Sequence, residues 1–142
     1  MRYSSGRTYS IAVHDDAQAD LDRIYEEDED AAADIEVFLE EAKNNQETLD
    51  NLTRKGYVQY GDQPFDVKEW ERAKRLKYNL WRLRLLWLGG AAAKYRIIYA
   101  FHPIEHRYYV LGIVERNFNY DPQHERSKQI LAAYDLLDIP RY

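Results

Sequence analysis

Three arginines, Arg82, Arg84 and Arg96, lie inside the largely apolar segment Asn79–Phe101. The segment contains no Asp or Glu, so none of the three has an acidic neighbour in the surrounding sequence. A guanidinium group is planar and can bind two phosphate oxygens at once. Arginines that have no carboxylate partner and lie among apolar residues therefore predict an anionic ligand, and phosphate is the best chemical match.

Aromatic and further basic residues accompany these arginines. Arg116 lies at the end of the next apolar run, and Tyr120 follows it four positions later. Aromatic rings can stack on unpaired bases, and basic side chains attract the phosphate backbone. The pattern predicts binding of single-stranded RNA or another phosphate backbone. We expect four additional side chains to contact the RNA: Lys77, Lys94, Tyr99 and Phe118.

The alternation of side chains along a strand predicts where the arginines point. Successive side chains of a strand point to opposite faces, so Trp81, Leu83 and Leu85 share one face while Arg82 and Arg84 share the other. We expect helices to cover the apolar face and the arginines to lie outside the core. Like charges that lie opposite each other destabilise a sheet, so an anion should relieve their repulsion.

Apolar residues at helical spacing predict a pair of helices in the first half of the chain. A short strand over Thr8–Val13 comes first, and Asp15 or Asp16 then supplies an N-cap side chain. The spacing is interrupted near Asp28–Asp30, so the two helices should form a hairpin with its turn there. The region Asn44–Gly61 is polar and predicts a connection.

The second half predicts three strands and a last helix. The segment Phe65–Asn79 fits either a short basic helix or an extended lead into the first strand. The strands should cover Leu80–Leu88, Lys94–Phe101 and Tyr108–Arg116. A last amphipathic helix should have Pro122 in its first turn and end before Pro140. The predicted fold is α+β in the order β-α-α-β-β-β-α, an antiparallel sheet with helices on one face.

The composition is that of a folded globular protein. Of the 142 residues, 45% are hydrophobic and 32% are charged, which is typical of a globular domain and not of a disordered chain. The absence of cysteine excludes disulfides and thiolate metal sites. The first residues lack the long apolar core of a signal peptide or membrane span. We therefore expect one cytoplasmic domain over residues 1–142.

The charge is divided unequally along the chain. The net charge is −5, yet Met1–Tyr60 holds 6 Lys+Arg against 15 Asp+Glu, whereas Lys68–Arg116 holds 11 against 4. A surface field depends on where the charges lie. The central segment can therefore attract a polyanion although the whole molecule is acidic.

Two stretches of the sequence resemble the RelE/ParE toxin superfamily. They read "LWRLRLLWLGGAAAKYRIIYAF" and "YVLGIVERNFNYD". In that family, basic residues alternate along a strand, a "YR.IY" strand follows, and a third strand ends in Arg with Tyr four residues later. The resemblance implies the family fold and a toxin of a bacterial type II toxin–antitoxin pair, commonly an endoribonuclease that cuts mRNA on the ribosome.

The resemblance assigns roles position by position. Arg82 and Arg84 stand at the paired basic positions, and Arg96 stands at the "YR" arginine. Arg116 and Tyr120 stand at the terminal Arg and Tyr. Many members have a histidine just before that last arginine, whereas this chain has a glutamate there, which leaves the proton transfer without its usual side chain.

The chemistry that the resemblance implies needs neither a metal nor a cofactor. An RNA 2′-hydroxyl attacks the adjacent phosphate, so the enzyme must align the two groups, stabilise the added negative charge and move two protons. Arg82, Arg96 and Arg116 would hold the phosphate, with Arg84 assisting. Tyr120 would act as general base or acid, for which the arginines would have to lower its pKa from the ordinary value of about 10.

Two functions from different classes fit the resemblance, and both involve partners. The first is a ribonuclease whose partners are mRNA and the ribosome. The second is a ParE-like toxin that inhibits a protein such as DNA gyrase without cleaving it. The complete set of arginine and tyrosine positions favours the ribonuclease. Either toxin would be monomeric by itself, would bind no membrane, and would form a hetero-oligomer with a cognate antitoxin.

Overall fold

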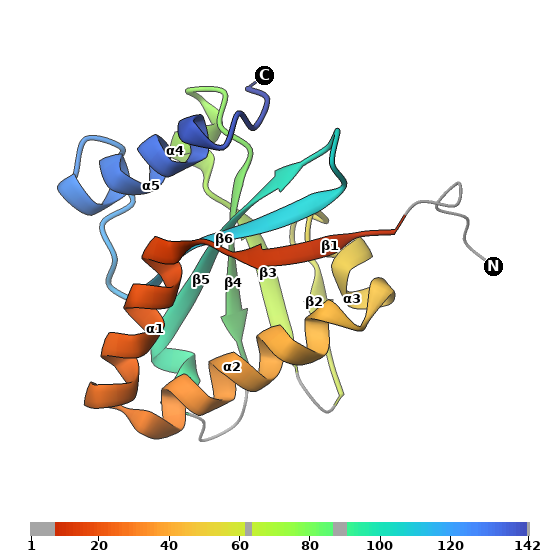
Figure 1. Ribbon diagram of the computed structural model, residues 1–142, viewed down its shortest axis with the longest axis vertical. Coiled ribbons are helices and arrows are strands. Elements are labelled where there is room, and N and C mark those ends of the chain that lie inside the picture. Colours follow the sequence, from red (N-terminus) through yellow and green to blue (C-terminus); the bar gives the residue numbers. More distant parts are fainter. Residues whose placement is uncertain (1–7, 62–63, 87–90, 142) are drawn as a thin grey trace.

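The computed structural model describes residues 8–61, 64–86 and 91–141, which form one mixed α+β domain around an open sheet (Figure 1). The strands of this part of the chain are β1 (Ser10–Val13), β2 (Val58–Gln59), β3 (Phe65–Glu69), β4 (Leu80–Leu85), β5 (Tyr95–His102) and β6 (Arg107–Glu115). The helices are α1 (Asp15–Glu27), α2 (Glu29–Lys43), α3 (Gln46–Asp50), α4 (Glu71–Lys74), the 3-10 helix η1 (Ala91–Lys94) and α5 (Glu125–Leu136). The predicted α+β class is confirmed.

The sheet has the strand order β1-β6-β5-β4-β3-β2. The predicted meander of β4, β5 and β6 is confirmed, because each strand pairs with the next in antiparallel register. The prediction of a wholly antiparallel sheet is wrong, because β1 is parallel to β6. β1 and β6 are not consecutive in the chain, so no hairpin turn forces them to be antiparallel; after β1 the chain passes through α1, α2 and α3 and re-enters the sheet at β2 on the opposite edge.

The region between the helical hairpin and β4 is more regular than predicted. The predicted connection Asn44–Gly61 contains α3 and β2. Both interpretations of Phe65–Asn79 are correct in part, since β3 occupies its beginning and α4 follows immediately. The predicted element order therefore lacks α3, β2, β3 and α4. β3 matters most for the site because it pairs with β4, the strand that carries Arg82 and Arg84.

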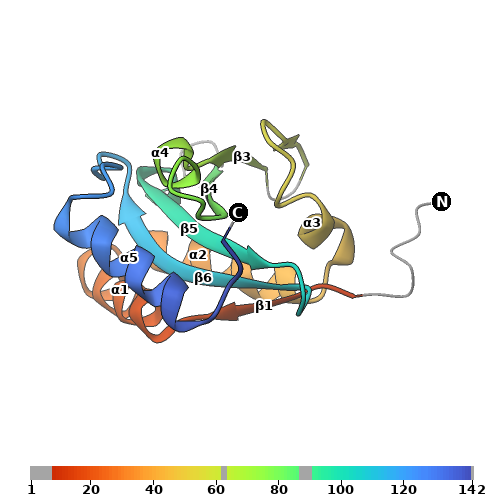
Figure 2. The same cartoon turned by 90° about the horizontal axis from the view of Figure 1, so that it is seen from above.

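Helices lie on both faces of the sheet, so the prediction that they cover one face is wrong. α1, α2 and α3 bury one face, with Trp81 and Leu83 of β4 in that core. α4 and α5 bury part of the other face, where Ile98 of β5 and Leu111 of β6 pack against α5. Figure 2 shows α4 on the opposite side of the sheet from α2. The reason is that β5 and β6 are apolar on both faces and need cover on both.

The two helices of the hairpin begin at capping side chains. His14 Nδ1 accepts a hydrogen bond from Asp16 N at 3.1 Å, so His14 is the N-cap of α1 and the prediction of Asp15 or Asp16 is wrong. Both aspartates lie in the first turn instead, where they favour the helix dipole. Asp28 caps α2 by accepting from Ala31 N at 3.2 Å, which confirms the predicted break of the hairpin.

A buried carboxylate joins α1, β6 and α5. Asp20 Oδ2 accepts from Ile113 N at 2.9 Å and from the guanidinium of Arg126, and Asp20 Oδ1 accepts from Arg23 at 3.2 Å. The contact lies next to a register shift between β5 and β6. A Cβ at Gly112 would lie 3.1 Å from Arg126 Nη2 and 3.2 Å from Ile130 Cδ1, so the glycine lets these side chains of α5 approach the strand without shifting.

Two hydrogen bonds to backbone carbonyl oxygens fix the loop between β6 and α5 at Asn119 and Tyr120. Trp70 Nε1 donates to the carbonyl oxygen of Tyr120 at 2.9 Å. Ser127 Oγ, in the first turn of α5, donates to the carbonyl oxygen of Asn119 at 2.8 Å. α5 begins at Glu125, so the prediction that Pro122 lies in the first turn of this helix is wrong. These bonds hold Tyr120 over the face of the sheet that carries the arginines.

Candidate functional site

Arg82 and Arg84 have an acidic partner that the surrounding sequence does not contain. Asp66 of β3 accepts from Arg82 Nη1 at 2.7 Å through Oδ1 and from Arg84 Nη2 at 2.6 Å through Oδ2. The prediction that these arginines are unpaired is therefore wrong. The pairing of β3 with β4 places Asp66 directly opposite Arg84, and Arg82 is its diagonal neighbour. Arg82 is also buried, with 9% of its surface exposed.

Asp66 remains ionised between the two arginines. Burial by itself raises the pKa of this carboxyl, but the hydrogen bonds from Arg84 and Arg82 outweigh burial and hold its pKa below the ordinary value of 3.8. Each guanidinium uses only one of its nitrogens on Asp66 and has five N–H donors in all. The carboxylate thus fixes both side chains while leaving donors for a second anion.

Arg96 of β5 lies beside this group without a carboxylate of its own. Its Nη1 donates to the carbonyl oxygens of Ala93 and Tyr95 at 2.9 and 3.0 Å, and it forms no ion pair with any described residue. Burial lowers the pKa of Arg96, and repulsion from Arg82 and Arg84 lowers it further. Arg84 Nε is buried and also has no hydrogen-bond partner among the described residues. The cluster therefore has more cationic donors than Asp66 can neutralise.

Tyr120 completes the cluster. Its ring meets the edge of Trp70 at 5.6 Å and of Phe118 at 4.9 Å between centroids. Its hydroxyl has no hydrogen-bond partner in the described part of the chain. Burial raises the pKa of Tyr120, and the charges of Arg82 and Arg96 only partly oppose this, so the pKa lies above 10.0. The requirement that the arginines make Tyr120 more acidic is not met, and at neutral pH the side chain is a proton donor.

A groove of about 540 Å³ adjoins this cluster. Arg82 and Tyr120 belong to its lining. The rest comes from the β3–α4 segment and the loop before β2, and its charged side chains are Lys55, Lys68, Glu69, Glu71 and Arg72. The lining therefore holds four cations against two carboxylates and a phenol, an arrangement that can bind a phosphate ester and give it a proton.

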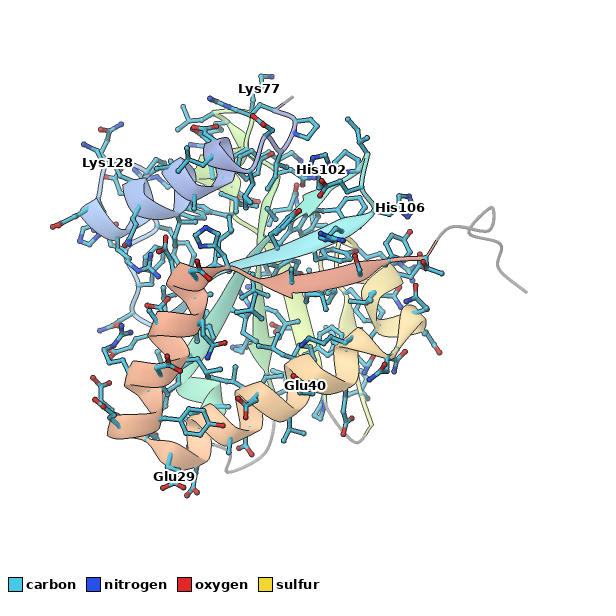
Figure 3. The ribbon with its side chains drawn as sticks, viewed as in Figure 1. Glu29, Glu40, Lys77, His102, His106 and Lys128 are labelled. Carbon is cyan, nitrogen blue, oxygen red and sulfur yellow. The ribbon has the colours of Figure 1, made fainter. Side chains whose placement is uncertain are left out.

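The structure does not bring together all of the residues that the sequence predicted. Arg116 is exposed in the turn after β6, outside the lining of the groove. Lys94 Nζ lies 3.7 Å from Asp28 Oδ2 at the beginning of α2. Lys77 lies in the turn before β4, at the top of Figure 3 and at the opposite end of that strand from Arg84. None of these side chains shares a described contact with the cluster.

The two aromatic predictions have different outcomes. Tyr99 is 1% exposed, and its hydroxyl donates to the carbonyl oxygen of Leu52 at 2.6 Å, beneath the hairpin helices. A fully buried ring has no face to offer a base, so the prediction that Tyr99 binds RNA is wrong. The cause is strand parity, because Tyr99 points to the face that α1, α2 and α3 cover. Phe118 is half-buried against Trp70 and Tyr120, where it supports the tyrosine.

Sequence reasoning missed Asp66, Lys68 and Trp70. The signal was present in "FDVKEW", where Phe65 and Val67 alternate with Asp66 and Lys68 as in a strand with one apolar face. Among the described residues, no group of three or more His, Asp or Glu side chains could hold a metal ion. No helix of that part of the chain is both long and apolar enough to cross a membrane.

The fold and the site define a mixed α+β protein with a cationic groove on an otherwise helix-covered sheet. No family model, curated protein or solved structure matches the chain significantly. The similarity to the RelE/ParE superfamily therefore stays a prediction that rests on the quoted motifs.

Proposed function

We propose that this protein is the toxin of a type II toxin–antitoxin system and acts as a metal-independent endoribonuclease on mRNA at the ribosome. The observation that supports the proposal most directly is that Arg82 and Tyr120 line one groove while Arg96 lies close enough to both to interact with them electrostatically. These side chains come from β4, β5 and the loop after β6, and their positions agree with the roles that the resemblance implies.

The arginines would stabilise the charge that develops during cleavage. Attack of the 2′-hydroxyl forms a bond from the 2′-oxygen to phosphorus and breaks the bond to the 5′-oxygen, so negative charge grows on the phosphate oxygens. Arg82 is already oriented by Asp66, and Arg96 is oriented by two backbone carbonyls. Groups that need no reorganisation stabilise a transition state most effectively. Arg84 assists by sharing Asp66 with Arg82.

Tyr120 would supply the proton for the leaving group. Its raised pKa keeps the phenol protonated at neutral pH, and its hydroxyl has no competing partner among the described residues. The phenol would donate its proton to the 5′-oxygen and regain one from water. The proton of the 2′-hydroxyl would pass to water. The products would be a 2′,3′-cyclic phosphate and a free 5′-hydroxyl.

A cognate antitoxin is the other partner in the proposal. An acidic segment of such a protein would bind the cations of the site that have no acidic partner among the described residues, such as Lys68 in the groove and Arg96 beside it. Binding there would cover the phosphate site and silence the enzyme. The complex would unfold at a higher temperature than the toxin, since a ligand of the folded state stabilises it.

The test combines product chemistry with one substitution. Purified protein should cleave mRNA in the presence of ribosomes and excess EDTA, and the upstream fragment should end in a 2′,3′-cyclic phosphate. Arg96→Ala should lower the cleavage rate by about 100- to 1,000-fold, because it removes a charge aimed at the transition state. Primer extension measures the rate, and thermal unfolding checks the fold.

Arg75→Ala is the matched control. Arg75 is exposed at the end of α4, outside the lining of the groove, so the rate should stay unchanged. Full activity of a folded Arg96→Ala protein would refute the assignment of the site. Growth arrest without new RNA ends would instead favour a toxin that grips a protein target.

A further inference from the structure

Besides Arg82 and Tyr120, the groove is lined by residues that the proposed chemistry does not use. We call the part of the groove that they line its extension; the side chains concerned are Lys55, Lys68, Glu69, Trp70, Glu71 and Arg72. The whole volume, about 540 Å³, falls in the range of about 300–1,000 Å³ that is usual for small-molecule sites. It can therefore hold more than the phosphate that reacts.

Most of the charged groups in this extension are already paired. Lys55 Nζ lies 3.5 Å from Glu69 and 3.7 Å from Glu71. Arg72 lies 3.6 Å from Asp121. Lys68 differs, because it forms no ion pair with any described residue although it is exposed at the groove. Of the two lysines in the groove lining, Lys68 is therefore the one whose charge no carboxylate of the described residues neutralises.

The register of the sheet places Lys68 at a position that is unfavourable without a ligand. Lys68 of β3 lies directly opposite Arg82 of β4, on the same face. Side chains at such positions have Cβ atoms about 5 Å apart, and like charges there destabilise the pair. Asp66, the carboxylate two residues before Lys68 on the same face of β3, is already bound by Arg82 and Arg84. An anion bound beside Lys68 would remove this repulsion.

We infer that Lys68 binds the phosphate of the RNA nucleotide next to the one that is cleaved, and that the extension of the groove holds this nucleotide. The inference rests on the proposed function and adds a second phosphate position to it. Trp70 is only 2% exposed, so the extension has no free aromatic face for a base to stack on. Recognition at this position is therefore of the backbone, without preference for a base.

The experiment measures binding of a short single-stranded RNA whose 2′-hydroxyls are methylated, so that it cannot be cleaved. Fluorescence anisotropy at several salt concentrations gives the dissociation constant and its salt dependence. For Lys68→Ala we expect about fivefold weaker binding, of similar size for different RNA sequences, and a salt slope smaller by about 0.7, the value of one phosphate contact on a single strand.

Lys128→Ala is the matched control, since it removes the same charge from the exposed side of α5, away from the groove (Figure 3). Its affinity and salt slope should equal those of the wild type. A second probe replaces one phosphate, next to the cleavage position, with an uncharged methylphosphonate. The wild type and Lys68→Ala should bind this RNA equally well, because the contact is already lost. Thermal unfolding verifies that both variants are folded.

The possible failures can be told apart. If the wild type neither binds nor cleaves RNA, the proposed function and this inference fall together. If the wild type binds and cleaves, but Lys68→Ala and Lys128→Ala behave alike, the second phosphate position is wrong and the ribonuclease stands. If Lys68→Ala still weakens binding of the methylphosphonate RNA fivefold, Lys68 contacts another part of the strand and the assignment is refuted.

Discussion

Asp20 and Asp66 are both buried carboxylates that accept hydrogen bonds from arginine, but their surroundings differ. Asp20 accepts hydrogen bonds from Ile113 N, Arg126 and Arg23, and its Oδ2 joins α1 to both β6 and α5. Asp66 receives only Arg82 and Arg84, which belong to the same strand. The hydrogen bonds around Asp20 lie within α1 or between elements packed against one another. The ion pairs of Asp66 lie beside further cations and a groove.

The difference shows how the same ion pair can serve structure or function. Around Asp20 the backbone and α5 supply the remaining partners, so removing the carboxylate would leave buried donors without acceptors. Around Asp66 the cations outnumber the carboxylates, because Arg96 and Lys68 have no carboxylate partner among the described residues. The positive charge there is therefore not fully neutralised. Asp66 fixes two arginines beside a groove, and Asp20 holds α5 against the sheet.

Asp20→Ala should have the largest effect on stability. The change removes a buried ion pair and leaves Ile113 N without an acceptor, so we expect the free energy of unfolding to fall by about 2–4 kcal/mol. Urea unfolding followed by circular dichroism measures it. Asp22→Ala, on the exposed side of the same helix, should cost much less. Equal losses for the two variants would contradict the structural role of Asp20.

Asp66→Asn should have a smaller effect that depends on pH. The folded protein holds the pKa of Asp66 below 3.8, so the carboxylate contributes stability above that pH and loses it as the pH falls through the lowered pKa. We expect the variant to be less stable by about 1–3 kcal/mol at neutral pH, where charged hydrogen bonds are lost.

The difference between the wild type and Asp66→Asn should shrink as the pH falls below about 4. Urea unfolding at a series of pH values gives this difference directly. A difference of the same size at neutral and acidic pH would mean that Asp66 does not act as an ionised partner of Arg82 and Arg84.

Charge reversal on the helical hairpin should have the smallest effect. Glu27 and Glu29 lie near the turn between α1 and α2, far along the chain from the groove residues, and Figure 3 shows Glu29 at the outer end of the hairpin. Glu27→Lys with Glu29→Lys should leave the cleavage positions unchanged and speed RNA association at most a few-fold, because only long-range attraction changes.

The salt dependence of this variant separates the two regions further. Added salt screens exposed charges, so the gain in association rate should disappear at high ionic strength. Stopped-flow fluorescence with labelled RNA measures the rate. If the hairpin variant loses toxicity while Arg96→Ala keeps it, the helical surface is the working one and a toxin that binds a protein becomes the better account.

Much of the fold could be predicted because its signals are local. The break between α1 and α2 depends on Asp28, whose side chain caps the helix three residues ahead. The meander of β4, β5 and β6 depends on short separations between apolar runs. Parity correctly placed Trp81 and Leu83 on the core side of β4 and Arg82 on the other. Each inference needed only residues within a few positions of one another.

The candidate site could be predicted only in part. The sequence identified Arg82, Arg96 and Tyr120. In the structure Arg82 and Tyr120 line one groove, and Arg96 interacts electrostatically with both. The pairing of β3 with β4 could not be predicted from the sequence, since β3 follows a stretch that was predicted to be a connection. Asp66 and Lys68 were missed for that reason, although the alternation of "FDVKEW" could have indicated a strand.

By itself, the sequence determined which residues alternate along each strand and which faces are apolar, because side-chain direction follows from backbone geometry over two to four residues. Only the tertiary structure decided that Asp66 pairs with Arg82 and Arg84, that Tyr99 is buried while Tyr120 lines the groove, and that α5 covers part of the second face. The physical reason is that strand pairing and helix docking join positions far apart in the chain, and local spacing carries no information about which distant strand supplies the partner.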